Sequence, residues 1–174
     1  ALSALPLEPS LSDGRPDLVV WPETAVPFLL NEAGPALKDI AAHSGTTTLV
    51  GIQRSDGAAW FNSLAEFTPD AGIGAVYDKF HLVPFGEIVP FRDSAPWLYN
   101  LLMTFTPYDS DYNVTAGESP VRMEAGGGRF AAPICFESAI ARVCRRMVYD
   151  GEEKKVDFLA NISNDGWFHD TIEL

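Results

Sequence analysis

A strand, a helix and a second strand follow one another early in the sequence, and this unit constrains the fold most. Asp17 to Trp21 is predicted to be a short buried strand, and Thr46 to Gln53 is predicted to be another because it is rich in β-branched residues. Between them, Phe28 to Ser44 has apolar residues at helical spacing and ends before Gly45. Two strands connected through a helix lie parallel in one sheet, so the sequence predicts an α/β fold.

The rest of the sequence predicts a hairpin and a second strand–helix–strand unit. Ala59 to Thr68 and Ile73 to Lys79 are predicted to be two strands joined by the turn sequence PDAG. The later unit has a buried strand over Arg129 to Cys135, a helix over Ser138 to Tyr149 and a strand over Asp157 to Ser163. Both units therefore point to parallel pairing within the α/β fold.

The length and charge of the chain limit what it can be and bind. Its 174 residues suit one domain, residues 1–174, with a core of its own. The formal net charge of −12, from 24 acidic and 12 basic residues, argues against nucleic acid and against electrostatic attachment to an anionic membrane surface. No apolar run reaches the roughly 20 residues that cross a bilayer. The cysteines and histidines show no metal-ligand spacing, so no metal or other cofactor is expected.

Cys135, in the stretch PICFES, lies where a predicted strand ends and a predicted helix begins. A turn at that point can expose the sulfur, and a helix N-terminus favours the thiolate, which is the reactive form of cysteine. The alternative is an inert core residue. Cys144 is predicted to be such a core residue, because it belongs to the apolar stripe of the following helix.

Three further polar residues lie at or just beyond the C-terminal ends of predicted strands, namely Glu23, Lys79 and Asp165. That edge of an α/β sheet is where sites are built. A cysteine nucleophile needs a base and a group that stabilises the oxyanion, and Glu23 and Lys79 are candidates for these roles. Together with Cys135 they would transfer an acyl group through a thioester. Alternatively, Glu23 is a charge at a helix entry and Lys79 a solvated strand end.

Four stretches, WPET, YDKFHLVPFGE, PICFES and NISNDGWF, carry a family resemblance in their order and spacing. The chain from Asp17 to Phe168 resembles the nitrilase, or carbon-nitrogen hydrolase, superfamily. That resemblance implies an α-β-β-α sandwich and a Glu-Lys-Cys triad. Within the superfamily, WPET combined with HLVPFGE and SNDGWF is similar to the apolipoprotein N-acyltransferase family, whose members complete bacterial lipoprotein maturation.

The resemblance assigns roles to individual residues. It implies that Glu23 is the general base, Lys79 the oxyanion-stabilising lysine and Cys135 the acyl-accepting nucleophile. Glu87 matches a further glutamate near the thiol, although a loop carboxylate that holds backbone N–H groups is an alternative. Glu137 matches a carboxylate just after the nucleophile, and a helix-start charge favoured by the dipole is its alternative.

Other matched positions concern the surroundings of the site. Asn62 matches an asparagine of the family, but a turn asparagine is the favoured interpretation. Phe136 stands where the family often has tyrosine, so no hydroxyl is available there. Asn164, Asp165 and Trp167 are expected to shape the pocket floor rather than react.

The resemblance also implies partners and a location. The acyl donor would be a phospholipid and the acceptor a diacylglyceryl lipoprotein, at the bacterial inner membrane with this domain facing the periplasm. The family enzyme is an integral membrane protein, and this chain lacks a span, an opening strand and helix before Asp17, and later strands beyond Leu174. We therefore expect a domain truncated at both ends, contacting the membrane through parts absent from this chain, less stable than a complete domain and inactive alone.

Two other functions and one segment remain open at this point. A soluble amidase or nitrilase would use the same triad with water as acceptor, and a non-catalytic binding module would keep only the fold. Residues 88–112 hold an apolar cluster between Trp97 and Phe105. This segment is predicted to be either a lid for a lipid substrate or a short amphipathic helix that caps the core.

Overall fold

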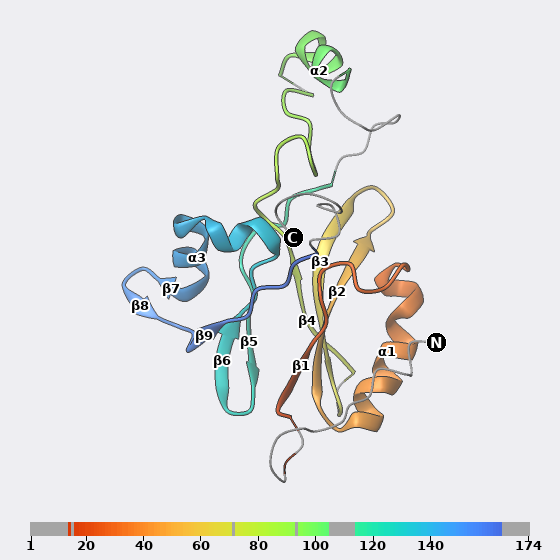
Figure 1. Cartoon of the computed structure of the whole chain (residues 1–174), viewed down its shortest axis with the longest axis vertical. Coiled ribbons are helices and arrows are strands. Elements are labelled where there is room, and N and C mark those ends of the chain that lie inside the picture. The colour runs from red at the N-terminus through yellow and green to blue at the C-terminus, as the bar shows by residue number, and fades with distance from the viewer. Residues whose placement is uncertain (1–13, 15, 71, 93, 105–113, 165–174) are drawn as a thin grey trace, which may run out of the picture.

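The two larger β-sheets, of four and three strands, stand side by side in the computed structural model, with one helix on the outer side of each (Figure 1). The structure describes residues 14, 16–70, 72–92, 94–104 and 114–164. Helix α1 packs beside the first sheet and helix α3 beside the second, which gives the layer order helix, sheet, sheet, helix. This arrangement agrees with the predicted α/β fold and with the α-β-β-α sandwich that the resemblance implied.

The first sheet has four strands in the order β1-β2-β3-β4. Its members are β1 (Leu18–Val20), β2 (Thr47–Ser55), β3 (Trp60–Thr68) and β4 (Gly72–Asp78), with α1 (Leu30–Ser44) between the first two. Strands β1 and β2 are parallel, whereas β2, β3 and β4 pair antiparallel. The predicted strand–helix–strand unit and the following hairpin are therefore confirmed, and α1 ends at Gly45 in the left-handed conformation, as the glycine suggested.

The second sheet has three strands in the order β5-β6-β9. They are β5 (Arg122–Ala125), β6 (Gly128–Ala131) and β9 (Phe158–Leu159), and β9 runs parallel to β6 after helix α3 (Ala141–Val148). The second strand–helix–strand unit is thus confirmed. Strand β5 was missed, as was a hairpin after α3. The strands of that hairpin are β7 (Tyr149–Asp150) and β8 (Glu153–Lys154).

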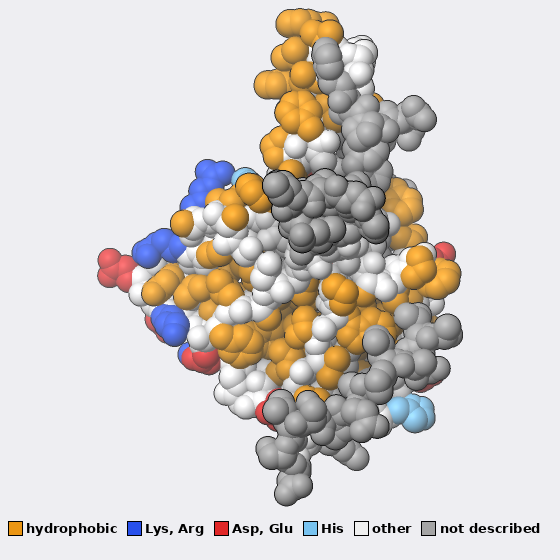
Figure 2. Space-filling model, viewed as in Figure 1, with side chains coloured by type: hydrophobic (Ala, Val, Ile, Leu, Met, Phe, Trp, Pro, Cys, Tyr) orange, Lys and Arg blue, Asp and Glu red, His pale blue; other side chains and the backbone are white. Residues whose placement is uncertain are grey.

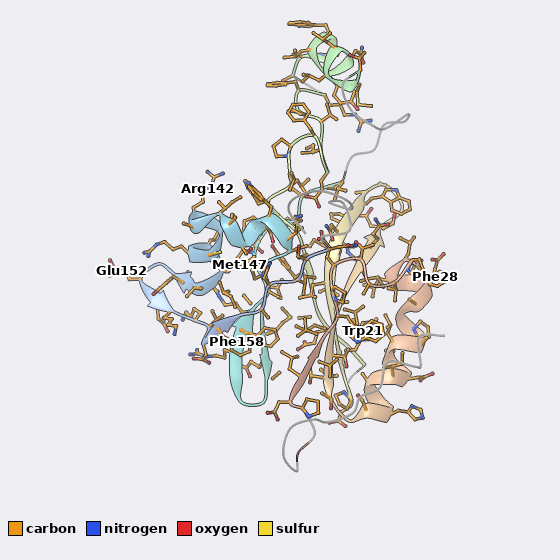
Figure 3. The ribbon with its side chains drawn as sticks, in the orientation of Figure 1. Trp21, Phe28, Arg142, Met147, Glu152 and Phe158 are labelled. Atoms are coloured by element: carbon orange, nitrogen blue, oxygen red, sulfur yellow. The ribbon has the colours of Figure 1, made fainter. Side chains whose placement is uncertain are left out.

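The predicted helix over 138–149 is divided into two helices. A short 3₁₀ helix, η2 (Cys135–Ala139), precedes α3, and the extended residue Ile140 separates them. Cys144 is half-buried rather than part of the core, and its sulfur lies 3.4 Å from the carbonyl oxygen of Ser138. Met147 lies on the buried side of α3, which faces the second sheet. Arg142 points away from that sheet (Figure 3).

The core consists of two clusters, one on each face of the first sheet. Alternate residues of β2 and β3 face α1 on one side and the second sheet on the other, because side chains along a strand point to opposite faces. Val50, Ile52 and Phe67 pack with α1, whereas Leu49 and Leu64 pack with residues of the second sheet. The first sheet is therefore buried on both faces, and its strand ends are held firmly in place.

Helix α2 (Pro96–Met103) stands apart from both sheets (Figure 1). None of its residues is buried, and Trp97 and Leu101 are 72% and 51% exposed. Apolar side chains cover much of this projection (Figure 2). The segment does form a short helix, but the alternative in which that helix caps the core is wrong. Within the described part of the chain, no helix has the length and apolarity that crossing a bilayer requires.

Candidate active site

The three residues of the predicted triad each follow a strand or a strand pairing. Glu23 follows β1, and Lys79 follows β4 directly. Cys135 follows Ile134, which pairs in parallel with Ile162 beyond the end of β9. Within the first sheet β1 and β4 run in the same direction, so Glu23 and Lys79 lie at the edge where α/β sheets build their sites.

Lys79 lies at the centre of a buried polar cluster. Its ammonium nitrogen is 2.9 Å from both carboxylate oxygens of Glu87 and 3.8 Å from Oε1 of Glu23. The side chain of Lys79 is 1% exposed and that of Glu23 9%. The structure thus brings Glu23, Lys79 and Glu87 together, and Lys79 is not a solvated strand end.

The cluster has two carboxylates for one ammonium group. A buried charge that loses its partner destabilises the fold strongly, because neither water nor another ion replaces the contact. Glu87 also accepts the backbone N–H of Val83 at 2.9 Å, so it does act as a loop carboxylate that holds a backbone N–H group, as the alternative interpretation predicted. One side chain therefore orders the loop after β4 and fixes the ammonium group of Lys79.

Asn62 connects the two carboxylates. Its Nδ2 donates to Oε1 of Glu23 at 2.7 Å and to Oε1 of Glu87 at 2.9 Å. The turn interpretation of Asn62 is wrong, since this residue lies within β3 with a side chain that faces the cluster. Its Oδ1 is buried without a hydrogen-bond partner among the described residues, so one acceptor remains for a group that enters the site.

Cys135 occupies a strained turn. Its φ of 54° lies in the left-handed region, where a residue with a β-carbon is disfavoured. The backbone N–H of Cys135 donates to the carbonyl oxygen of Ile162 at 2.6 Å, which fixes the turn against the neighbouring chain segment. A sharp turn from a strand into a helix is the arrangement that presents a nucleophile at the top of a sheet. Cys135 is half-buried and packs against the core with this backbone conformation.

Glu137 joins the cysteine turn to the lysine strand. One of its oxygens accepts the backbone N–H groups of Phe80 and His81 at 3.1 and 3.0 Å. The other accepts the hydroxyl of Tyr77 at 2.6 Å and the N–H of Ile134 at 2.9 Å. Its side chain is completely buried. The helix-start interpretation is therefore only part of its role, because the same carboxylate binds residues on both sides of Lys79.

The Tyr77 hydroxyl remains a donor to this carboxylate. Burial raises the pKa of Tyr77 far above its ordinary value, and the charge of Glu137 raises it further. Ionisation of the phenol next to a buried carboxylate would place two negative charges in contact. The raised pKa consequently keeps the proton on the Tyr77 hydroxyl, which can donate it to Glu137.

A third connection comes from the segment after β9. The backbone N–H of Asn164 donates to Oε2 of Glu23 at 3.2 Å, while the Asn164 residue itself is exposed. Asn164 thus contacts the site through its backbone. Asp165 and Trp167, which were expected beside it, lie outside the described residues.

Gly51 allows the turn that contains Pro22 and Glu23 to approach the sheet. This role of Gly51 was not predicted from the sequence. A β-carbon at Gly51 would lie 2.6 Å from Cα of Glu23 and would overlap the carbonyl oxygen of Pro22. Both contacts are with backbone, which cannot move aside as a flexible side chain can. The only signal in the sequence was a glycine within a strand pattern, which often marks a close backbone approach.

Comparison with known proteins identifies relatives along nearly the whole chain. Residues 12–172 match the family model described as carbon-nitrogen hydrolase. The apolipoprotein N-acyltransferase of Rhizobium meliloti (strain 1021) is 34% identical over 180 residues, covering 98% of this chain and 32% of that protein. The apolipoprotein N-acyltransferase of Geobacter metallireducens is 31% identical, covering 89% and 29%. The chain spans about a third of the length of these curated relatives.

Solved structures share the arrangement of sheets and helices. XC1258 from Xanthomonas campestris, a CN-hydrolase superfamily protein with an arsenic adduct in its active site, has a TM-score of 0.58 and 25% identity over 91% of this chain and 55% of that one. An amidase from Nesterenkonia sp. has a TM-score of 0.59 and 14% identity over 84% and 51%. The second likeness concerns the fold alone.

Proposed function

This chain belongs to the carbon-nitrogen hydrolase family, and we propose that it is the catalytic part of an N-acyltransferase that works through a cysteine thioester. The acyl donor is a phospholipid, and the acceptor is the N-terminal amine of a diacylglyceryl lipoprotein. The relatives named apolipoprotein N-acyltransferase support this assignment. In this proposal the domain works at the bacterial inner membrane on the periplasmic side.

The first half-reaction moves the acyl chain to the protein. Glu23 takes the thiol proton of Cys135 as the sulfur attacks the ester carbonyl carbon. Lys79 stabilises the negative charge that develops on the carbonyl oxygen. The tetrahedral intermediate then collapses, its carbon–oxygen bond breaks, and Glu23 returns the proton to the departing lysophospholipid oxygen. The products are a thioester at Cys135 and a lysophospholipid.

The second half-reaction delivers the chain to the acceptor. The neutral amine attacks the thioester carbonyl, an amide bond forms, and the Cys135 sulfur leaves. Glu23 accepts the proton that the amine loses and returns it to the thiolate, which restores the starting state. In both half-reactions Glu87 and Asn62 hold Lys79 and Glu23 in position. They do not contact the reacting atoms.

One observation carries the proposal above all. A lysine at the end of β4 is held between Glu23 and Glu87, at the same edge as a cysteine in a strained turn. An arrangement that served stability alone would gain little from burying three charged groups. The same observation disfavours a binding module without catalysis.

Transfer and hydrolysis can be distinguished by the fate of the acyl group. The full-length protein that contains this chain is incubated with a phospholipid that carries a radiolabelled acyl chain and a diacylglyceryl peptide that has a free N-terminal cysteine amine. In a separate reaction it is incubated with a short aliphatic amide. We expect label on the peptide amine and little ammonia from the amide. Ammonia release without peptide labelling would instead establish the amidase, which shares the chemistry up to the thioester. The exposed apolar surface of α2 favours the lipid.

Helix α2 is proposed to be a lid that contacts the lipid substrate as it enters the site. Changing Leu101 and Leu102 to aspartate should lower acyl transfer from phospholipid vesicles about tenfold or more, because apolar contact area is lost. The reaction of Cys135 with a small soluble thiol reagent should not change. As a control, Phe28→Asp with Ile73→Asp alters two apolar residues that are exposed elsewhere. Equal loss of transfer and thiol reactivity, with a lower melting temperature, would show that α2 supports the fold.

A further inference from the structure

Positive charge is concentrated on one part of this acidic chain. Seven of the twelve Lys and Arg residues lie within residues 122–155 beside five acidic residues, so this segment carries a formal charge of +2 and the remainder −14. Figure 2 shows Lys and Arg side chains gathered over α3 and the β7–β8 hairpin. The net charge of the chain argued against electrostatic attachment to an anionic membrane. The electrostatic potential at this surface is set by the local charges, and these are mostly positive.

The basic side chains of α3 surround an open hollow of about 250 Å³. It is lined by Arg142, Arg145, Arg146, Tyr149 and Gly151. The guanidinium group of Arg145 lies over the ring of Tyr149 at 5.0 Å, and that of Arg146 lies over the ring of Phe80 at 5.1 Å. An aromatic ring contacts the face of a guanidinium group and leaves its edge, with the N–H donors, available for a ligand.

The backbone around the hollow is fixed by another arginine. Arg122 donates to the carbonyl oxygens of Met147 at 3.0 Å, Tyr149 at 2.9 Å and Arg146 at 3.3 Å. These carbonyl groups belong to the end of α3, where intrahelical donors are absent. The hollow is therefore preorganised before any ligand binds.

Among the residues that the structure describes, the arginines of the hollow, Arg142, Arg145 and Arg146, have no carboxylate partner. Glu152, at the tip of the hairpin, lies well away from Arg142 (Figure 3). In a chain with twice as many acidic as basic residues, three neighbouring arginines without a carboxylate indicate a site for an anion from outside the protein.

We propose that this hollow binds the phosphate of an anionic phospholipid headgroup, so that α3 docks on a negatively charged membrane surface. Guanidinium groups bind phosphate in the bidentate geometry that their planar edge allows. Lipid is favoured over free phosphate because an apolar ring adjoins the arginines: the ring of Phe80 contacts Arg146. The proposal rests on the use of a phospholipid by this protein.

Vesicle binding tests the site without any turnover. The full chain is sedimented with vesicles of phosphatidylcholine alone and with vesicles of equal parts phosphatidylcholine and phosphatidylglycerol. Arg142→Gln with Arg145→Gln should lower partitioning onto the anionic vesicles about 30-fold, because each arginine near such a surface contributes roughly a fivefold factor. Arg146 is left unchanged because it also donates to the carbonyl oxygen of Glu118.

The matched control is Lys38→Gln with Arg129→Gln, which lowers the net charge equally at positions outside the hollow. Loss of binding in the hollow variant alone supports the site, whereas equal loss in both variants shows a general charge effect and overturns it. Release of wild-type protein by inorganic phosphate, but not by chloride at the same ionic strength, is expected because both phosphates would occupy one site, whereas binding of inorganic phosphate without partitioning onto anionic vesicles would overturn the lipid assignment. Acylation of Cys135 by detergent-dispersed phospholipid is measured in parallel, so that failure of the proposed function is seen separately from failure of this site.

Discussion

Replacing Cys135 with alanine should remove both the covalent intermediate and the activity. Without the sulfur no thioester can form, and loss of the nucleophile lowers kcat by about 10⁶-fold where a comparable two-step enzyme has been tested. Mass spectrometry of the full-length wild-type protein after incubation with phospholipid should find the acyl mass on the peptide that contains Cys135. The alanine variant should show none.

The second cysteine provides the control for this experiment. Cys144 is also half-buried, but its sulfur contacts the backbone carbonyl groups of Glu137 and Ser138 and it lies within α3. Cys144→Ala should therefore keep full acylation. An acyl group found at Cys144, or turnover that persists in Cys135→Ala, would rule out the proposed mechanism.

Replacing Lys79 with methionine should have the next largest effect. Lys79→Met removes the group proposed to stabilise the oxyanion, and one such contact contributes about 10²–10³-fold to the rate. Acylation of Cys135 measured in a single turnover reports this step directly. A loss below tenfold would exclude the oxyanion role.

Stability needs a separate control, because Lys79→Met also leaves Glu23 and Glu87 as neighbouring buried carboxylates without a cation. The double variant Lys79→Met with Glu87→Gln restores the charge of the cluster. It should recover most of the melting temperature that the single variant loses, while acylation stays low. Recovery of acylation together with the melting temperature would show that Lys79 only balances charge.

The strand ends were predictable from the sequence because their signals are local. Apolar runs, the β-branched stretch at 47–50 and the glycine after α1 define the first unit within a few residues. Strands that run in one direction present their C-terminal ends at one edge, so Glu23 and Lys79 could be predicted to lie at the same edge. Their contact could not be predicted in this way, because β1 and β4 are the outer strands of the sheet and the turn after β1 brings Glu23 against Gly51 of β2.

The supporting residues could not be predicted in the same way because their partners are distant in sequence. Asn62 contacts Glu23 across 39 residues, and Glu137 contacts Tyr77 across 60. No periodicity records such pairs, so Asn62 was assigned to a turn and only the local part of the role of Glu137 was evident. The position of helix α2 could not be predicted for a different reason. An apolar stripe along a helix has the same sequence pattern whether the helix packs on a core or stands apart from it.

The left-handed backbone of Cys135 favours one residue type for stability and another for the reaction. A residue with a β-carbon in a sparsely populated conformation costs about 1–3 kcal/mol, and glycine would avoid most of that cost. The residue that suits this turn best for stability is thus one that has no sulfur. The remaining contacts of the turn, above all those of Glu137, must therefore offset the strain of a residue that is there for its thiol.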